Sequence, residues 1–401
     1  MRTLIVNSMF ASAMYRRCAE ELGTIPGMEL TMLTVREWRM NARPMPFEPL
    51  SPDAMYGTVI GNVGWKGFEN RGFYTSGLRR AFQRSRPDVL FLMEEPFSIF
   101  ASQVLLAKSL FAPRIPVVFF TWNNLSLTTF DYRPSIFYRT VARHTLPRMD
   151  YALTANAAGV EVLRQAGFTK PVRIIGYGVD TEIFRTGEQD RSLEIRRRFG
   201  IEPEDAVIGY IGRLLEMKGV DLLIEALACL NSEQAFKRIK LLLVGSGEAE
   251  QSLLELAQKR GIGSIVRHVP SVAPGEVADY MRALDILVLP SRRQGMWAEQ
   301  FGRVLVEAMA AGKIVIGSFS GAIPEVVRNA GFIFPENDVK GLTSVIKQAL
   351  TLRSPARSEL LGRARERAEY FSWRRFANDA FEAISFLYEN ARLRSERKRS
   401  E

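Results

Sequence analysis

The sequence predicts an α/β protein built from two doubly wound, Rossmann-like domains. Short apolar runs alternate with amphipathic stretches along the chain, which is typical of successive βα units with a parallel sheet. One such series is complete before about residue 185, and a second complete series follows it. The length of 401 residues fits two domains, or three. A single large α/β domain is less favoured, because each series is complete by itself.

The first series predicts five buried strands, at residues 4–6, 30–35, 89–93, 117–120 and 151–154. Helices are expected between these strands, for example over residues 13–22 and 96–110. Residues 36–75 interrupt the alternation, and their prolines and glycines predict a long loop region.

The second series predicts strands at residues 207–211, 240–244, 266–269, 286–290 and 314–317, with helices at 220–230, 250–259, 274–283 and 303–311. A polar stretch over residues 178–201 joins the two series. The last segment, 353–401, is predicted to be helical, strongly charged and apolar along one side. We therefore expect domains at residues 1–184 and 185–372, followed by a helix over residues 373–401.

The chain is strongly basic, with 54 lysines and arginines against 44 aspartates and glutamates and a net charge of +10. Such a surface attracts nucleic acid, an anionic membrane face or a phosphorylated small molecule. The two cysteines exclude a disulfide-rich scaffold, and the two histidines leave little material for a metal site. No apolar run reaches the roughly 18 residues of a membrane-spanning helix. The run at residues 4–6 is too short for a signal peptide, so a cytoplasmic location is expected.

Two cationic side chains follow the first strand of the second series. Gly212 and Arg213 come directly after strand 207–211, and Lys218 follows shortly. A glycine at a strand end lets a ligand approach the backbone, and ligands of open α/β sheets bind at the carboxyl edge. Arg213 and Lys218 are therefore candidates for holding a phosphate. A solvated loop explains these two residues equally well.

Two carboxylates frame the start of the helix predicted over residues 303–311. Glu299 lies in the loop ahead of the helix and Glu307 on its second turn, so they are about 12 Å apart if the whole stretch is helical. Carboxylates so placed can hold hydroxyl groups at both ends of a ligand whose anionic middle faces the helix N-terminus. A nucleotide sugar has this layout. Spacing alone favours the alternative, which is two solvated glutamates on an ordinary helix.

Several motifs occur together in one order and spacing: Gly212-Arg213-Leu214, Lys218-Gly219, Pro290-Ser291, Glu299 with Glu307, Pro324-Glu325, and Gly178-Val179-Asp180 at the domain junction. This set resembles the retaining GT-B glycosyltransferases of group 1 (family 4-like), which include sucrose synthase and the mannosyltransferases of lipid glycan assembly. The resemblance covers roughly residues 176–335 and is weak before them. Several motifs in register are much more specific than any one of them.

The resemblance implies a GT-B fold, in which two Rossmann-like domains face a central cleft and a C-terminal helix crosses back to the first domain. Residues 1–184 would bind the acceptor and residues 185–372 the nucleotide sugar. The implied catalytic residues are Arg213 and Lys218, on the donor diphosphate, and Glu299, on hydroxyls of the transferred sugar. The implied donor-binding residues are Gly212, Phe301, Gly302 and Glu307, the last on the ribose.

No metal cofactor is expected, because Arg213 and Lys218 would neutralise the diphosphate. A UDP-sugar is the default donor. In such retaining enzymes an oxygen of the leaving phosphate can take the acceptor proton, so no histidine base is required. Fixed cations then stabilise the negative charge that bond cleavage builds on the diphosphate.

The chain departs from this family after the fourth strand of the first domain. Many relatives have a histidine there, whereas this chain has Thr121-Trp122-Asn123-Asn124. Asn123 is an acceptor-side candidate, although a turn is the commoner use of an Asn-Asn pair. Glu95, after strand 89–93, is the second acceptor-side candidate, and a carboxylate at a helix N-terminus is its equally supported alternative.

The sequence therefore predicts a retaining, hexosyltransferase-like glycosyltransferase that uses a glycan, lipid-linked or small-molecule acceptor, as in polysaccharide biosynthesis. The alternatives are a nucleotide-sugar epimerase of similar fold and a non-catalytic nucleotide-sugar-binding subunit. Nucleic acid is not an expected partner. Residues 1–185 hold 22 lysines and arginines against 15 aspartates and glutamates, so the basic excess lies on the acceptor half. This excess fits a peripheral contact with an anionic inner-membrane face, or a generic solvated surface.

Overall fold

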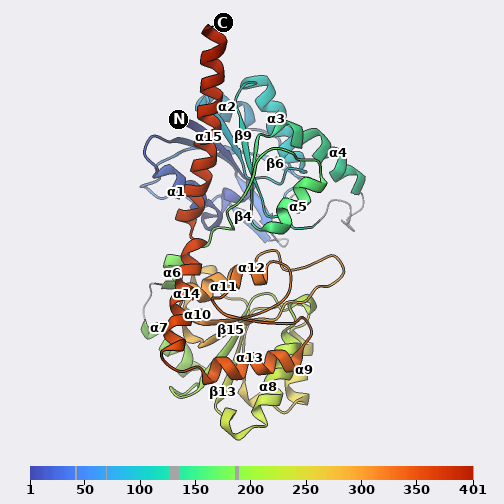
Figure 1. Cartoon of the computed structure of the whole chain (residues 1–401), viewed down its shortest axis with the longest axis vertical. Helices are drawn as coiled ribbons and strands as arrows, with labels where there is room; N and C mark the ends of the chain where they lie inside the picture. Colours follow the sequence, from blue (N-terminus) through green and yellow to red (C-terminus); the bar gives the residue numbers. More distant parts are fainter. Residues whose placement is uncertain (41–42, 69, 126–134, 186–188, 401) are drawn as a thin grey trace. The chain divides into compact units, whose positions relative to one another are not determined.

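The computed structural model describes residues 1–40, 43–68, 70–125, 135–185 and 189–400 (Figure 1). The chain divides into two compact units, each with its own parallel sheet. The first unit is Met1–Gly178 together with the segment that begins at Trp373, and the second is Val179–Ser372. The first unit thus ends slightly before the boundary expected at residue 184. The expected fold class, two doubly wound α/β domains, is confirmed.

The sheet of the first unit has seven parallel strands in the order β11-β10-β9-β8-β1-β2-β5. In chain order they are β1 (Arg2–Val6), β2 (Glu29–Val35), β5 (Gly57–Gly61), β8 (Val89–Leu92), β9 (Val117–Thr121), β10 (Tyr151–Thr154) and β11 (Val172–Ile174). The strand order reverses between β1 and β8, so this is the switch point at which such sheets bind ligands.

Helices cover both faces of this sheet (Figure 1). One face buries a core under α2 (Leu78–Ser85), α3 (Ile99–Phe111), α4 (Ser135–Thr145) and α5 (Ala157–Gln165). The other face packs against α1 (Ala13–Gly23) and α15 (Trp373–Ser400). Phe376 of α15 contacts Phe120 with ring centroids 5.0 Å apart. The apolar side predicted for the final segment is therefore buried in the first unit.

The long loop expected over residues 36–75 is wrong in part. The segment contains β5, which pairs in parallel with β2, and two short antiparallel hairpins, β3 (Glu37–Met40) with β4 (Arg43–Pro46) and β6 (Val63–Gly64) with β7 (Phe73–Tyr74). Prolines and glycines do not exclude strands at a sheet edge or in a small hairpin, where few ladder hydrogen bonds are needed. Because prolines and glycines are typical of loops, the sequence pattern did not predict these strands.

The sheet of the second unit has six parallel strands in the order β14-β13-β12-β15-β16-β17. They are β12 (Ala206–Ile211), β13 (Ile239–Val244), β14 (Val266–Val269), β15 (Ile286–Leu289), β16 (Ile314–Ser318) and β17 (Phe332–Phe334). The switch point lies between β12 and β15. The five strands predicted here are confirmed, whereas the three-residue edge strand β17 was not predicted.

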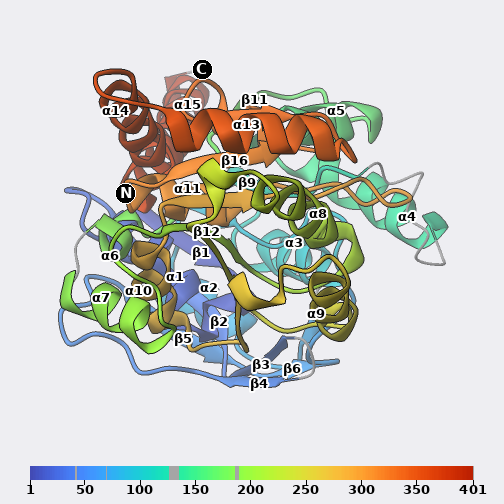
Figure 2. The same ribbon diagram turned by 90° about the horizontal axis from the view of Figure 1, so that it is seen from below.

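The helices of this unit contact one another in two groups. The first group is α8 (Val220–Asn231), α9 (Glu250–Lys259) and α13 (Val339–Thr351). The second group is α6 (Thr181–Arg185), α7 (Gln189–Arg198), α10 (Val277–Ala283), α11 (Arg303–Ala310) and α14 (Ala356–Tyr370). Figure 2 shows α8, α9 and α13 together, apart from α6, α7 and α10. This is the two-sided helix cover of a doubly wound sheet.

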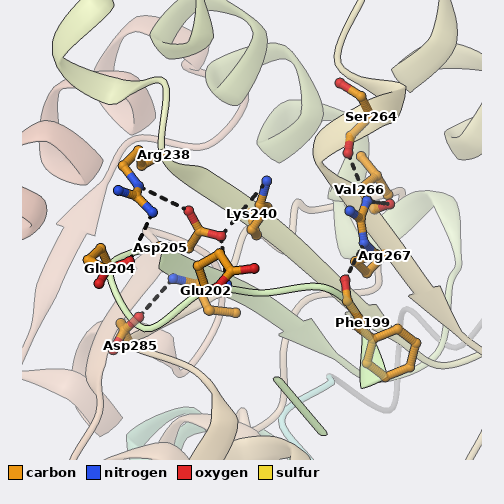
Figure 3. Close-up of polar contacts among 11 residues, drawn as sticks. Phe199, Glu202, Glu204, Asp205, Arg238, Lys240, Ser264, Val266, Arg267 and Asp285 are labelled. Carbon is orange, nitrogen blue, oxygen red and sulfur yellow. Dashed lines mark hydrogen bonds and ion pairs between the residues drawn. The ribbon is translucent and has the colours of Figure 1, made fainter. Parts of the chain in front are cut away.

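The amino edge of the same sheet is tied together by charged groups (Figure 3). Asp205, just before β12, accepts from Arg238 Nε at 3.4 Å and lies 3.9 Å from Lys240 Nζ. Asp285, just before β15, accepts from the Val207 N–H and from Arg196, each at 2.8 Å. These charged side chains stabilise the starts of the strands. A ligand is therefore expected to bind at the opposite edge, where the strands end.

Candidate functional site

Two loops lie beside each other at the switch point of the second sheet. One follows β12 and contains Gly212 and Gly219, and the other follows β15 and begins at Pro290. Gly219 has a positive φ of 67°, and a Cβ atom there would collide with the Pro290 carbonyl oxygen. Gly212 also has a positive φ, of 155°. Glycine is therefore needed for the close approach of the two loops.

An ion pair joins these loops. Lys218, at the end of a 3₁₀ turn over Glu216–Lys218, places its Nζ 2.6 Å from Oε2 of Glu299. The same carboxylate oxygen accepts a hydrogen bond from Ser291 Oγ at 2.8 Å. The two charged side chains are only 15% and 11% exposed. The structure thus brings together two of the three residues predicted to be catalytic.

Arg213, the third of these residues, lies on the same loop as Lys218. Its carbonyl oxygen accepts a hydrogen bond from the Tyr210 hydroxyl at 2.7 Å, which fixes the backbone at the end of β12. Its side chain is exposed. An anion at this edge could therefore meet a fixed ammonium group from Lys218 and an adaptable guanidinium from Arg213.

The backbone of Glu299 is held by the loop that follows β16. The Ala322 N–H donates to the Glu299 carbonyl oxygen at 2.9 Å. Gly321 has a positive φ of 53°, and a Cβ atom there would collide with the same carbonyl oxygen. The Pro324-Glu325 motif follows at once, in α12 (Ile323–Val327). Three strand ends therefore contribute to the position of one carboxylate.

Helix α11 begins directly after this carboxylate. Gly302 is its N-cap with a left-handed backbone at φ 80°, and the buried Phe301 ring packs edge-on against Phe371 at 5.0 Å. The dipole and the backbone N–H groups at a helix N-terminus favour an anion. The predicted helix start near residue 302 is confirmed.

Glu307 lies on the second turn of α11 and is buried. Its carboxylate is 2.9 Å from Nε of Arg303, one turn earlier. Burial is the largest influence and raises the pKa of Glu307, while the charge of Arg303 and its hydrogen bond lower it. A buried carboxylate with one partly exposed partner retains acceptor capacity for a ligand hydroxyl.

A short loop between Ser291 and Glu299 was not singled out from the sequence. It doubles back on itself through a bridge between Gln294 and Trp297, and the Trp297 ring centroid lies 4.8 Å from Lys218 Nζ. Gln294 also donates to Glu216 at 3.0 Å. The sequence signal that could have indicated this loop is Gly295 two residues before Trp297. A glycine in a loop favours a turn, and a turn can place a nearby aromatic ring against a site.

A second polar cluster lies at the switch point of the first sheet. Glu94, after β8, accepts from the Ser8 N–H at 2.5 Å, so the segments that follow the paired strands β1 and β8 are joined. Glu95 accepts from the Thr121 hydroxyl at 2.6 Å and from the Trp122 N–H at 3.2 Å. Both carboxylates are buried. Glu95 was predicted on the acceptor side, whereas Glu94 was not, because its partner Ser8 is distant in sequence.

Asn123 forms a local turn. Its Nδ2 donates to the Leu125 carbonyl oxygen at 2.7 Å, and its Oδ1 accepts from the Leu125 N–H at 3.2 Å. These bonds match the turn that an Asn-Asn pair commonly makes. An acceptor contact by Asn123 stays a prediction.

Among the residues that the structure describes, no cluster of three His, Cys, Asp or Glu side chains is placed to hold a metal ion. Of the two histidines, His268 lies in β14 with Nε2 2.9 Å from the Gly245 carbonyl oxygen, and His144 lies in α4.

Comparison with known proteins assigns the second unit. The profile of the family described as "Glycosyl transferases group 1" matches residues 192–369. Residues 192–369 are therefore a group 1 glycosyl transferase domain. The ion pair of Lys218 with Glu299, the α11 N-terminus and Glu307 all lie inside the group 1 domain, whereas Glu95 and Asn123 lie outside it.

Curated relatives include two proteins named D-inositol 3-phosphate glycosyltransferase. The one from Saccharomonospora viridis is 31% identical over 213 residues, which cover 51% of this chain and 47% of the relative. The one from Rhodococcus erythropolis is 30% identical over 272 residues, which cover 65% of this chain and 59% of the relative. This chain therefore spans about half the length of the curated relatives that it matches.

Solved structures share the fold of this chain over nearly its whole length. Sucrose-phosphate synthase from Thermosynechococcus elongatus has a TM-score of 0.68 at 18% identity and covers 97% of this chain and 99% of its own. The Anabaena protein HepE, in complex with UDP and glucose, has a TM-score of 0.67 at 18% identity, with 96% and 99% coverage. These neighbours are GT-B glycosyltransferases, so the GT-B fold predicted for this chain is confirmed.

Proposed function

We propose that this chain is a retaining hexosyltransferase that moves a sugar from a nucleoside diphosphate sugar to an acceptor hydroxyl. The observation that carries the proposal is the contact of the Lys218 ammonium with the Glu299 carboxylate, directly ahead of the α11 N-terminus. A cation, a carboxylate and a helix N-terminus at one sheet edge match the diphosphate and the sugar hydroxyls of such a donor.

In this proposal Lys218 and Arg213 hold the diphosphate and stabilise the charge that develops on it as the glycosidic bond breaks. Glu299 binds hydroxyls of the transferred sugar while it keeps Lys218 in place. The backbone at Gly212, Phe301 and Gly302 supports the donor.

Glu307 binds the ribose hydroxyls, for which its buried carboxylate is suited. The leaving phosphate takes the acceptor proton, and no metal ion is needed. If the transfer instead required a metal ion, EDTA would abolish turnover.

The donor that we propose is a UDP-sugar, since HepE binds UDP and glucose in the same fold. The acceptor that we propose is phosphorylated or lipid-linked. The name of the relatives, which specifies an inositol phosphate, and the basic excess of residues 1–185 both support an anionic acceptor. Glu95 and Asn123 are the acceptor-side candidates.

The test is release of nucleoside diphosphate from UDP-, GDP- and ADP-sugars, with and without D-inositol 3-phosphate or a lipid-linked glycan. The expected result is acceptor-dependent release with one donor base, and a product that keeps the donor's anomeric configuration by NMR. Lys218→Ala and Glu299→Ala should each lower turnover by about 10²-fold, which is the usual cost of removing one group that stabilises a transition state. Lys259→Ala, an exposed lysine of α9, is the control.

Three outcomes would contradict the proposal. Conversion of the donor sugar without diphosphate release would indicate an epimerase. Donor binding without any turnover would indicate a binding subunit. Unchanged turnover in both the Lys218 and the Glu299 variants would remove the assigned site.

A further inference from the structure

The outer surface of α2, α3 and α4 is strongly basic. None of these three helices contains an aspartate or a glutamate. The helices and the residues just after them carry nine basic side chains, all exposed except the half-buried Lys108: Arg79, Arg80, Arg84, Arg86, Lys108, Arg114, Arg139, Arg143 and Arg148. We call this surface the α2–α4 face. It accounts for much of the basic excess that the sequence places in the first half.

The three helices form a continuous layer. α2 contacts α3, and α3 contacts α4, on the face of the first unit's sheet opposite α15. Their inner sides already bury a complete core that includes Phe82, Phe100 and Tyr138. The outward side chains are therefore not needed for the packing of this unit.

Large apolar side chains project from the α2–α4 face among these cations. Leu106 is 62% exposed, Leu110 69% and Ile136 72%. Leu106 and Leu110 are one helical turn apart, so they share a stripe on α3. Phe111, 44% exposed, borders a surface depression of about 530 Å³ that Phe82 and Arg86 also line. Single exposed apolar residues are ordinary, but several of them on one basic layer of helices mark an interaction surface.

We propose that the α2–α4 face docks on the surface of an anionic lipid bilayer. Basic side chains are drawn to an anionic leaflet, and Leu, Ile and Phe side chains beside them can enter the boundary between headgroups and acyl chains. A bilayer needs no fixed complementary shape, which suits cations spread over three helices. Nucleic acid is less suited, because bases stack on aromatic rings and not on exposed leucine and isoleucine.

This contact would be peripheral. In the part of the chain that the structure describes, no helix is both long and apolar enough to cross a membrane. Attachment would rest on charge and a few apolar side chains, and it should therefore be reversible and sensitive to salt. It does not depend on the proposed transfer reaction, so it can be measured without turnover.

The experiment is co-sedimentation of the full chain with vesicles of phosphatidylcholine alone or with 30% phosphatidylglycerol, at low and high salt. The wild-type chain should bind the anionic vesicles and be released by salt. Since each basic residue near such a surface gives about a fivefold gain in partitioning, Arg79→Glu/Arg84→Glu/Arg139→Glu should lose at least about 10²-fold. Leu106→Ser/Leu110→Ser tests the apolar part and should lose about fivefold or more at low salt.

The matched control is Arg392→Glu/Arg394→Glu/Arg397→Glu, which makes the same charge change on the exposed end of α15. It should bind as the wild type does. Thermal unfolding of each variant shows whether the fold is kept, which is expected for exposed positions.

Equal binding to both vesicle types, wild-type binding by the α2–α4 variants, or loss of binding in the α15 control would each overturn the proposal. So would binding to polyglutamate through the same arginines without binding to vesicles, because the α2–α4 face would then fit an acidic protein.

Discussion

The Lys218 ammonium lies 2.6 Å from the Glu299 carboxylate and joins the loops that follow β12 and β15. These residues are 81 positions apart, and both side chains are largely buried. A charged group left without its partner in such a place is costly, while a pair replaced together by neutral groups is not. The contact therefore links the stability of the second unit to the positions of two proposed catalytic groups.

The first prediction concerns this coupling. Lys218→Met and Glu299→Gln should each lower the free energy of unfolding by about 2 kcal/mol, since each removes one charge of a largely buried ion pair. The double variant should lose clearly less than the sum of the two, with a coupling energy of at least about 1 kcal/mol. Urea unfolding of the four proteins measures it. Strict additivity would mean that the two side chains do not interact in solution.

The second prediction concerns Trp297, whose ring centroid lies 4.8 Å from Lys218 Nζ. A cation over an aromatic face gains about 0.5–2 kcal/mol, so the ring helps to hold the ammonium toward the donor site. Trp297→Ala should lower kcat/KM for the donor by about 10-fold, and Trp297→Phe should retain most of it.

Donor titrations of the two variants separate this role from simple loop packing. If Trp297 acts through Lys218, its effect should disappear in a Lys218→Met background. An equal loss of kcat/KM from Trp297→Ala in both backgrounds would mean that the ring does not act through Lys218. An unchanged kcat/KM in Trp297→Ala would mean that the ring has no role in donor use.

The parts of this fold that the sequence predicted are those with a strong local signal. Buried parallel strands are continuous apolar runs, and the helix that begins after Gly302 has regular apolar spacing. The site residues Lys218 and Glu299 were predicted from motifs, and their positions at strand ends implied the same sheet edge. That they touch could not be predicted, because a contact between loops 81 positions apart depends on backbone geometry at Gly219 and Pro290.

The parts that were missed have a weak or ambiguous local signal. β5 is a half-buried edge strand bounded by glycines, so its pattern matches that of a loop. Glu94 is bound by the Ser8 N–H, in a 3₁₀ turn that lies far away in sequence, and no local pattern predicts this contact. Trp297 acquires its contact from a turn at Gly295, and an isolated loop aromatic carries no periodicity.

The last prediction concerns Glu307, whose pKa is raised mainly by burial. Because folding raises this pKa, the folded chain holds the proton over a pH range in which the unfolded chain has lost it. Stability then falls as pH rises from the unfolded value near 4.5 through the folded pKa, and the cost stays constant above it. Glu307→Gln removes the cost of burying this charge. The variant also loses the ion pair with Arg303, but that side chain is 43% exposed, so the loss of stability is small.

Glu307→Gln should therefore be more stable than the wild type at pH 8, by on the order of 1 kcal/mol or a few degrees in Tm. The difference should shrink as the pH falls and vanish below about pH 4.5, where both side chains are neutral. The same variant should bind UDP about 10- to 100-fold more weakly, because a charged acceptor for the ribose hydroxyls is lost. Such a trade of stability for binding is expected of a ligand site.

Glu194→Gln, on an exposed position of α7, is the control and should change neither property. Thermal unfolding from pH 4 to pH 8, with and without UDP, checks both parts. A variant that is less stable than the wild type at pH 8 would contradict the proposed burial cost. A more stable variant with unchanged UDP affinity would support the burial cost but would show that Glu307 does not bind the donor.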